Sequence, residues 1–560
     1  MNFSMTIFFF FFFFFLMLFL FSIYFYLVDL SMMFEWVYLI IGCNNYSLIF
    51  YFDWISMIFL SFIFLISGCV LFYSIDYMWG DLNFIRFYFL VFMFIFSMIL
   101  LIICPDMFCM ILGWDGLGLV SYILVMYYQN NISLSSSILT VMSNRVGDLF
   151  LILGICYLIN LNSWHYMFYL NNNFILNLIY YFCFFSSITK SAQFPFMSWL
   201  PCAMAAPTPV SSLVHSSTLV TSGVYFLIRF NLFLNNFFSS FIMIISLLTI
   251  FISGLGACME NDLKKIIAFS TLSQLGLMFF SISLGMYHLS FIHLLIHAVF
   301  KSLLFLCSGF YIHCVGGSQD IRLMGSFISF YPFVSSMFLI GLLSLMGFPF
   351  FCGFYSKDFI IELFCLMNLN MMIFILFCFG MGLTILYSYR LCYYIFFGKI
   401  HYFKMMNFSS FFYMKFSMIF LGLMGISSGS FLLNLFNDLF MVILDDLMIF
   451  ISLILLFIFF FFGFFFINLM LKIKGYMMSL ISSMFFLNYF SQNFFSLNLF
   501  LVNLYVNEVE KKWMELPLSI MFKFLKFVFS FFDSLSYNYM IYFFCLFFIY
   551  LFIFLNIYFI

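Results

Sequence analysis

The chain carries titratable side chains inside otherwise apolar stretches, where such residues are energetically costly. It is 67% hydrophobic and only 7% charged over its 560 residues. A charged side chain at the centre of a bilayer costs about 2.5–3.5 kcal/mol on insertion scales, and such residues usually mark ion or proton pathways. We therefore predict a proton or ion pathway through this chain. Its candidate residues are Asp115, Arg145, Asp148, Lys190, His215, His293, His297, Lys301, Lys357 and Asp358.

Asp115 and Lys190 are the candidates for a charge switch between two spans. Asp115 lies in GWDGLGLVSY near the middle of an apolar run, and Lys190 precedes a proline-rich stretch. A desolvated lysine has a lower proton affinity, which a nearby carboxylate restores. Approach of the two groups would draw a proton onto Lys190, and separation would release it. The alternatives are a carboxylate satisfied by a neighbouring helix for folding and a lysine that extends to the membrane surface.

His293, His297 and Lys301 follow one another at intervals of four residues, so they line one stripe of a helix. Histidine titrates in the physiological pH range, and such a stripe could relay protons through intervening water. A metal site is the weaker alternative, because no carboxylate or cysteine stands at ligand spacing on the stripe. Arg145 and Asp148, three residues apart, fit an interhelical ion pair as well as a conducting role.

His215 and the pair Lys357–Asp358 each follow a stretch that interrupts a predicted helix. His215 could connect Lys190 to the second half of the chain, and Lys357–Asp358 lie where an exit would be needed. Catalytic motifs are missing: there is no GxGxxG, no Walker loop and no CxxC among the 15 cysteines. The net charge of −1 gives no sign of nucleic-acid binding. We expect no redox site, cofactor or metal in this chain.

Spanning helices are needed to position these residues. The mean hydropathy is +1.21, and apolar runs of about 20 residues predict an all-α polytopic membrane protein, whereas a β-barrel would show alternating segments of about 10 residues. The predicted spans, about fifteen in number, are 5–28, 53–75, 84–104, 107–128, 136–160, 174–195, 209–231, 236–258, 266–285, 287–313, 331–350, 371–397, 411–434, 447–470 and 539–559. The first span has no features of a cleaved signal, and we expect it to be retained.

Basic residues predict the orientation of these spans. We name the side from which the first span starts side A and the opposite side side B. Arg229 and Lys357 fall on side B. By the positive-inside rule, side A is the compartment of synthesis. The basic residues expected on side A are Arg86, Lys264, Lys265, Arg322, Lys399, Lys404, Lys472 and Lys474.

Two spans are interrupted by proline and glycine. Pro195 and Pro201 follow Lys190, and Gly347, Pro349 and Gly353 precede Lys357. Proline removes an amide donor and breaks helices, and matching breaks in two halves indicate a transporter with inverted repeats. Two five-helix units, 84–231 and 236–397, would each carry the break in the fourth helix. The odd helix number would invert the second unit relative to the first.

Five motifs closely resemble the subunit 5 family of mitochondrial respiratory complex I, the proton-pumping NADH:ubiquinone oxidoreductase. They are GWDGLGLVSY, SNRVGD, KSAQFPFMSWLPCAMAAPTPVSSLVHSSTLVTSGVY, ENDLKKIIAFSTLSQLG and HLLIHAVFKSLLFLCSG, in this order. The resemblance implies an antiporter-like subunit that translocates protons while NADH, FMN, iron–sulfur clusters and ubiquinone are held by other subunits. It implies inverted repeats and a lateral helix on side A. It matches Lys190 to the family's central broken-helix lysine, and Lys357 and Asp358 to its exit-side pair. Arg145 and Asp148 match a conducting or coupling pair, and the hydrophilic axis corresponds to His215, His293, His297 and Lys301.

The family has two features that this chain lacks or alters. Many relatives have Glu where this chain has Asp115, and the shorter side chain would need a water to reach Lys190. Many members also have one more span near the N-terminus than we predict. With the resemblance, the expected segments are N-terminal helices 1–83, a first antiporter-like repeat 84–231, a second repeat 236–397, additional helices 398–474, an amphipathic lateral helix region 475–538 and a last span 539–560.

Composition and resemblance together predict the location and partners. The 100 Phe, 41 Met and 35 Tyr indicate an A+T-rich organellar gene, and the resemblance implies the mitochondrial inner membrane. We expect partners among the membrane-arm subunits of complex I, including a neighbouring antiporter-like subunit, and lipids such as cardiolipin. Two alternatives stay open: a subunit of a multi-subunit cation/proton antiporter, and a structural clamp without its own proton path.

Overall fold

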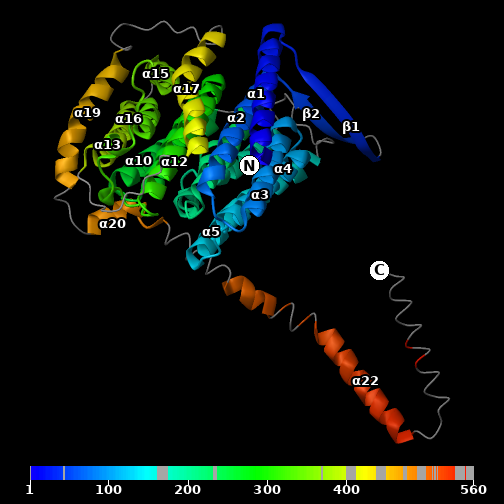
Figure 1. Cartoon of the computed structure of the whole chain (residues 1–560). Helices are drawn as coiled ribbons and strands as arrows, with labels where there is room; N and C mark the ends of the chain where they lie inside the picture. Colours follow the sequence, from blue (N-terminus) through cyan, green and yellow to red (C-terminus); the bar gives the residue numbers. More distant parts are fainter. Residues whose placement is uncertain are drawn as a thin grey trace. The chain divides into compact units, whose positions relative to one another are not determined.

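The computed structural model describes most of the chain in two units. They divide between Tyr489 and Phe490, and each is described by itself. The elements of the first unit are packed helices and one hairpin (Figure 1). The described residues are 2–41, 44–159, 174–230, 236–366, 370–398, 411–436, 450–470, 476–487, 500–507, 509, 513, 515–535, 546 and 549.

The N-terminal part combines two helices with a β-hairpin. Helix α1 (Asn2–Val28) packs along α2 (Trp54–Tyr77), and the rings of Phe8 and Phe72 lie 4.6 Å apart. Between them, β1 (Met32–Ile41) and β2 (Asn44–Phe52) pair antiparallel. The strands are rich in aromatic and branched residues, which favour extended backbone. The all-α prediction assigned no element to residues 29–52, between the spans 5–28 and 53–75, so it did not include this hairpin.

The first half of the central bundle contains a broken helix where the prolines predict it. Helix α6 ends at Lys190, and Pro195 lies in the non-helical segment before a short 3-10 turn at Phe196–Ser198. The predicted span 174–195 therefore extends five residues beyond the end of α6. The helices are α3 (Phe84–Ile103), α4 (Met107–Val125), α5 (Asn131–Ile159), α6 (Phe174–Lys190), α7 (Trp199–Ala203), α8 (Thr208–Val210), the π-helix η3 (Ser211–Thr218) and α9 (Leu219–Arg229).

The second half also contains the predicted break. Helix α14 ends at Met346, because Gly347 adopts the left-handed conformation (φ +82°) that glycine allows at a helix C-terminus. The predicted span 331–350 therefore extends four residues beyond the end of α14, and the helix resumes as α15, which no predicted span included. The helices are α10 (Asn236–Met259), α11 (Leu263–Ser283), α12 (Tyr287–Cys314), α13 (Phe327–Phe330), α14 (Pro332–Met346), α15 (Cys352–Leu366) and α16 (Met371–Cys392), which continues as a π-helical turn, Tyr393–Phe397.

Within the described residues, ten helices are long and apolar enough to cross a membrane, and the polytopic helical class is confirmed. They are α1–α5, α10–α12, α16 and α17 (Phe412–Leu435). Other predicted spans correspond to the broken helices and to α19 (Ile451–Met470). The predicted span 539–559 lies outside the described residues, apart from two isolated positions.

Two helices with defined bounds lie in the predicted lateral region 475–538. They are α20 (Tyr476–Ser482) in the first unit and α22 (Glu515–Leu535) in the second. In α22, Lys523 and Lys526 are exposed together with apolar residues such as Phe524. A lateral position for this region stays a prediction, and so does the inverted-repeat relation of the two halves.

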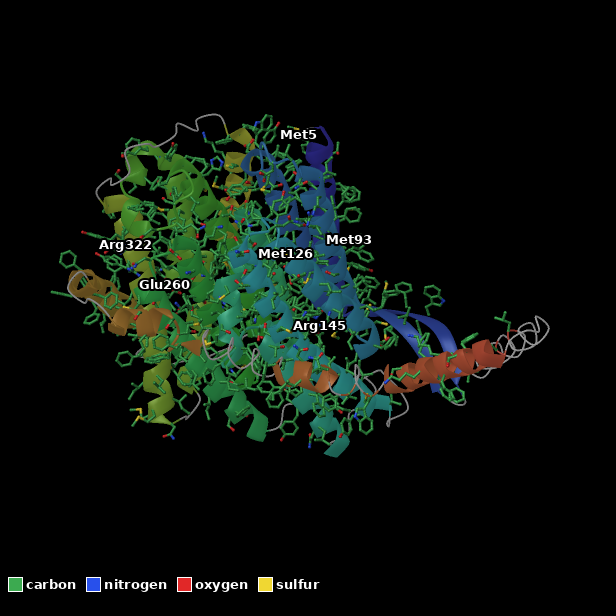
Figure 2. All side chains as sticks on the ribbon, turned by 90° about the horizontal axis from the view of Figure 1, so that it is seen from below. Met5, Met93, Met126, Arg145, Glu260 and Arg322 are labelled. Carbon is green, nitrogen blue, oxygen red and sulfur yellow. The ribbon has the colours of Figure 1, made fainter. Side chains whose placement is uncertain are left out.

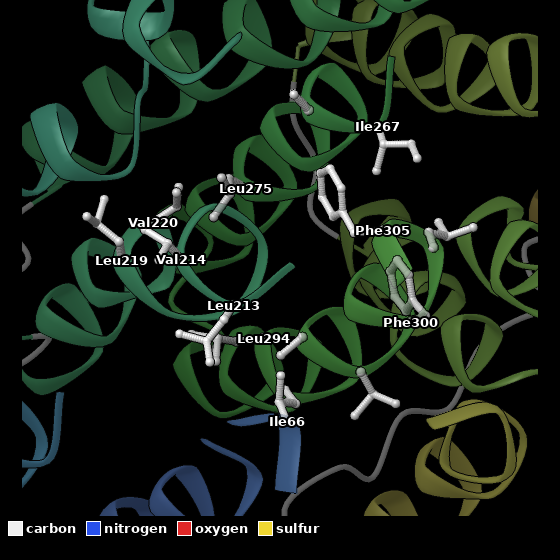
Figure 3. Packing of buried hydrophobic residues seen from close by; sticks show 14 of the residues in the cluster. Ile66, Leu213, Val214, Leu219, Val220, Ile267, Leu275, Leu294, Phe300 and Phe305 are labelled. Carbon is white, nitrogen blue, oxygen red and sulfur yellow. The ribbon is translucent and has the colours of Figure 1, made fainter. Parts of the chain in front are cut away.

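Helix α12 forms the centre of the first unit. It packs against α2, α11, α14, α15, α17 and η3, and its most apolar window is entirely buried. Figure 3 shows Leu294 and Phe300 of α12 among Leu213 of η3, Leu275 of α11 and Ile66 of α2. Lipid tails are as apolar as these side chains, so helix association depends on such close packing. The α12 side chains His293, His297 and Lys301 are buried among these helices.

Residues 261–264, at the junction of α10 and α11, form hydrogen bonds that join the two halves on side A. The backbone N–H of Ile321 donates to Asn261 at 3.0 Å, and Arg390 donates to the Asn261 side chain at 2.7 Å. Lys264, at the start of α11, donates to the carbonyl of Ala206 at 3.1 Å. Ala206 follows the first break, so these bonds tie α11, α16 and the 3-10 turn Ile321–Leu323 to the first half.

Candidate proton pathway

Arg145 joins two of the candidate carboxylates. Its Nη1 lies 3.3 Å from Asp115 Oδ2 on α4 and 3.2 Å from Asp148 Oδ2 on its own helix, α5. The spacing of three residues predicted the second contact but not the first. The Arg145 side chain, labelled in Figure 2, is 43% exposed in this isolated chain, and that of Asp115 is 34% exposed. The cluster therefore borders the outer surface of the chain.

Lys190 is buried at the end of α6 and binds a backbone oxygen. Its Nζ donates to the Trp114 carbonyl at 2.7 Å and lies 4.8 Å from the centre of the Trp114 ring. Among the described residues it forms no ion pair, since Asp115 is occupied by Arg145. In the proposed switch, Asp115 and Lys190 alternate between a paired and an unpaired state. The structure has them unpaired. A side chain at Gly118 would approach Nζ to 3.7 Å, so this glycine leaves the lysine room.

His215 lies in the π-helix η3 directly after the first break. It is buried, and neither ring nitrogen has a hydrogen-bond partner in the described part of the chain. Its ring lies 6.3 Å from the ring of Trp199. Single π-helical turns occur frequently at functional sites, and a buried polar group without a partner requires an explanation such as an internal water. In the described part of the chain, no hydrogen bond joins His215 to Lys190 or to the candidate residues of α12, so a proton connection would need water.

The α12 stripe has side-chain partners on two other helices. His293 Nδ1 lies 2.8 Å from Ser356 Oγ of α15, and its Nε2 lies 3.1 Å from Gln274 Oε1 of α11. Lys301 Nζ donates to Ser270 Oγ of α11 at 2.5 Å. Between them His297 is buried, and both its ring nitrogens are unpartnered among the described residues. The three polar side chains therefore follow one another along α12. Of the three, only His297 has no hydrogen-bond partner among the described residues, and a water could bind there.

Lys357 is held by the second break itself. Its Nζ donates to Thr384 Oγ1 at 2.8 Å and to the carbonyls of Met346 and Leu345 at 3.2 and 3.4 Å. These carbonyls belong to the last turn of α14, which the break leaves without helical partners. The C-terminal end of a helix carries partial negative charge, so the break provides a site for an ammonium group. Asp358, on the next position of α15, has one oxygen without a partner in the described chain.

The structure identifies polar residues that the sequence analysis did not select. They hold the candidate lysines and histidines: Trp114, Ser270, Gln274, Ser356 and Thr384. A sequence signal existed for Ser270 and Gln274, which stand four residues apart inside a predicted span. Within the described ranges, no group of three His, Cys, Asp or Glu residues could hold a metal ion.

Loss of the Gln274 amide is expected to impair the pathway without preventing assembly. Gln274→Leu removes one of the two partners of the buried His293 ring, at a cost of about 1–3 kcal/mol for an unsatisfied buried group. We expect fewer protons pumped per NADH in the assembled complex. Ser281→Ala, on the same helix, removes only a bond to the backbone of Met278 and serves as the control. Equal pumping by both variants would contradict a role for Gln274.

Comparisons with known proteins agree with this architecture. A family model described as "NADH:quinone oxidoreductase/Mrp antiporter, TM" matches residues 104–384, and "NADH-Ubiquinone oxidoreductase (complex I), chain 5 N-terminus" matches 36–88. NADH-ubiquinone oxidoreductase chain 5 of Anopheles gambiae is 50% identical over 417 residues, 73% of this chain and 72% of that protein. The same-named protein of Locusta migratoria is 51% identical over 385 residues, 68% of this chain and 67% of that one.

Solved structures share the fold at lower identity. A chain of the Mrp complex from a Dietzia species superposes with a TM-score of 0.70 at 21% identity, covering 80% of this chain and 52% of that one. A chain of the archaeal membrane-bound sulfane sulfur reductase gives 0.63 at 18% identity, covering 70% and 83%. Fold and site thus define an antiporter-like polytopic membrane subunit. The chain belongs to the NADH-ubiquinone oxidoreductase chain 5 family.

Proposed function

We propose that this chain is a proton-translocating membrane subunit of respiratory complex I. Relatives at about 50% identity over two thirds or more of their length carry the name of its chain 5. NADH oxidation and ubiquinone reduction take place on other subunits, which hold NADH, FMN, iron–sulfur clusters and ubiquinone. The chain conducts protons through the membrane while those subunits transfer electrons.

The observation that carries this proposal is the set of buried lysines held only by neutral oxygens. Lys190 binds a carbonyl, Lys301 a serine hydroxyl, and Lys357 two carbonyls and a threonine hydroxyl. In the described part of the chain, none of the three has a carboxylate within ion-pair distance. The protonation of such a lysine responds to any charge that moves close to it. A structural lysine would be expected to have a fixed carboxylate partner instead.

The Arg145 cluster supplies a charge that can move. In the present arrangement Arg145 binds Asp115 and Asp148. Release of Asp115 toward Lys190 would favour proton uptake by the lysine, and its return to Arg145 would favour release. One charge moved against 100 mV costs about 2.3 kcal/mol, so electron transfer must supply the energy. His215, His293, His297, Lys301, Lys357 and Asp358 would carry the proton onward.

The setting of the chain follows from this function. We infer the mitochondrial inner membrane as its location, and other membrane-arm subunits, including a neighbouring antiporter-like subunit, as its partners. Cardiolipin is the expected lipid contact. The segments 84–231 and 236–397 act as the two repeats. A cation/proton antiporter subunit is the second candidate: the Mrp-like fold supports it, but the names of the sequence relatives favour complex I.

The test is Lys190→Met in the intact complex, reconstituted in vesicles. We expect fewer protons pumped per NADH oxidised, or slower turnover, with normal assembly on a native gel. Lys523→Met, which removes an exposed lysine of α22, is the matched control. Normal pumping by Lys190→Met would instead support a structural clamp, for which deletion of 475–560 would disrupt assembly. Sodium–proton exchange without NADH would support the antiporter.

A further inference from the structure

A small cavity lies beside the second break, next to Lys357 and Asp358. Its volume is about 20 Å³, and its walls come from the break, from α15, from α16 and from α19. A cavity of about 10–15 Å³ or more can hold a water molecule. Helix α19 lies outside both predicted repeats, yet it contributes Ser452 to this wall.

The polar atoms around the cavity match the needs of a bound water. Asp358 Oδ1 and Ser452 Oγ are both buried and make no hydrogen bond of good geometry in the described chain. The two side chains are nevertheless neighbours, and both line the cavity with Lys357. An internal water requires two to four polar partners. The Asp358 carboxylate and the Ser452 hydroxyl supply two of them, from two helices. The Lys357 ammonium supplies a third by giving up its longest bond, that to the Leu345 carbonyl at 3.4 Å.

Glu362 continues this polar group along α15. It stands four residues after Asp358, which is one helical turn or about 6 Å further along the axis, and the two carboxylates interact. Residues at this spacing lie on the same helix face. Glu362 is partly exposed, whereas Lys357 is buried. Moving from Lys357 to Glu362 therefore leads away from the break and toward greater exposure.

We propose that this cavity holds a water that connects Lys357 to Asp358, that Ser452 positions this water, and that Glu362 is the next proton acceptor toward side B. The inference rests on the proposed function and adds two residues to it. The Lys357 ammonium gives a proton to the water while the water gives one to the Asp358 carboxylate. Lysine and aspartic acid are then both neutral. Asp358 passes the proton to the Glu362 carboxylate and regains its charge.

The first test fills the cavity. Ser452→Leu in the reconstituted complex should reduce the rate of NADH-driven proton pumping roughly tenfold, less than the about 10²-fold that a directly acting proton-transfer group contributes. Ser452→Ala keeps the space for water, so its rate of proton pumping should fall less than that of Ser452→Leu. Ser336→Leu, at an exposed serine of α14, is the control for the added side chain. An assembled Ser452→Leu complex that pumps normally would overturn the role of the cavity.

The second test does not depend on tolerance of the larger side chain. Glu362→Gln should reduce pumping, and Glu362→Asp should restore most of it, because a titratable carboxylate rather than a packing group is required. Normal pumping by Glu362→Gln overturns the exit route even if Ser452→Leu fails to assemble. If Lys190→Met impairs pumping but Ser452→Leu and Glu362→Gln do not, only the exit inference fails. If none of the three affects pumping, the proposed function fails as well.

Discussion

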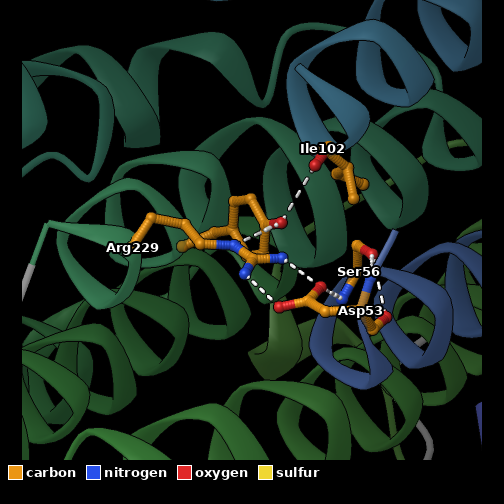
Figure 4. Close-up of polar contacts among 5 residues, drawn as sticks. Asp53, Ser56, Ile102 and Arg229 are labelled. Carbon is orange, nitrogen blue, oxygen red and sulfur yellow. Dashed lines mark hydrogen bonds and ion pairs between the residues drawn. The ribbon is translucent and has the colours of Figure 1, made fainter. Parts of the chain in front are cut away.

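Arg229→Met is expected to destabilise the first unit by about 3–5 kcal/mol, because it leaves Asp53 as a buried charge without its partner. Arg229 Nη1 and Nη2 bind the two Asp53 oxygens at 2.5 and 2.8 Å (Figure 4). The side chains of Arg229 and Asp53 are only 12% and 11% exposed. Arg229 Nε also donates to the Tyr225 hydroxyl, which in turn donates to the Ile102 carbonyl at 3.0 Å.

The position of this ion pair explains why its loss should be severe. Asp53 caps α2 through a reciprocal pair of bonds with Ser56, at 2.9 and 3.0 Å. Arg229 ends α9, the helix that continues from η3 and His215. The pair therefore fastens the entry of α2 to the end of α9 on side B. Without it, the hairpin, α2 and the π-helical segment would lose a shared anchor.

The measurement is the fraction of assembled complex that survives heating, read on a native gel. Arg322→Met is the matched control: Arg322 pairs with Asp320 at the surface, with 61% and 26% of the two side chains exposed. Exposed pairs contribute about 0–1 kcal/mol, so this variant should resist heat almost normally. Adding Asp53→Asn to Arg229→Met should recover part of the loss. Equal heat resistance of the two arginine variants would refute the anchor.

Gly353→Ala is expected to prevent correct packing of the second broken helix. A Cβ atom at Gly353 would overlap the backbone oxygen of Ser344 in α14. That oxygen cannot rotate away as a side chain would, so α14 and α15 must separate. Overpacking in a well-packed core typically costs about 1–3 kcal/mol and occasionally more. Separation would also remove the Met346 carbonyl from Lys357, so we expect both assembly and pumping to fall.

Native-gel assembly and protons pumped per NADH measure this effect. Gly425→Ala is the control, since a Cβ there would meet its nearest neighbour, Ile340, at an ordinary contact distance of 3.6 Å. Addition of a methyl group to α17 should therefore leave both readouts near normal. A Gly353→Ala complex that assembles and pumps like Gly425→Ala would show that the close approach of the two half-helices is not required.

The sequence by itself determined the helical class, most spans and both breaks. Apolar run length decides whether a helix can cross a membrane, and proline or glycine interrupts a helix through its own backbone; both effects are local. The rarity of charge in these runs also selected the ten candidate residues. The same local reasoning missed the hairpin at Met32–Phe52, because aromatic and branched residues suit a strand as well as a span.

Only the tertiary structure decided which groups meet. Asp53 and Arg229 are 176 residues apart, and Lys190 and Trp114 are 76 apart. No periodicity relates residues at such separations, since their contact depends on how whole helices pack. Local spacing correctly predicted that Arg145 and Asp148 share a face, but packing of α4 against α5 assigned Asp115 to Arg145 rather than to Lys190. Sequence therefore determined which charges lie in apolar helices, and packing determined their partners.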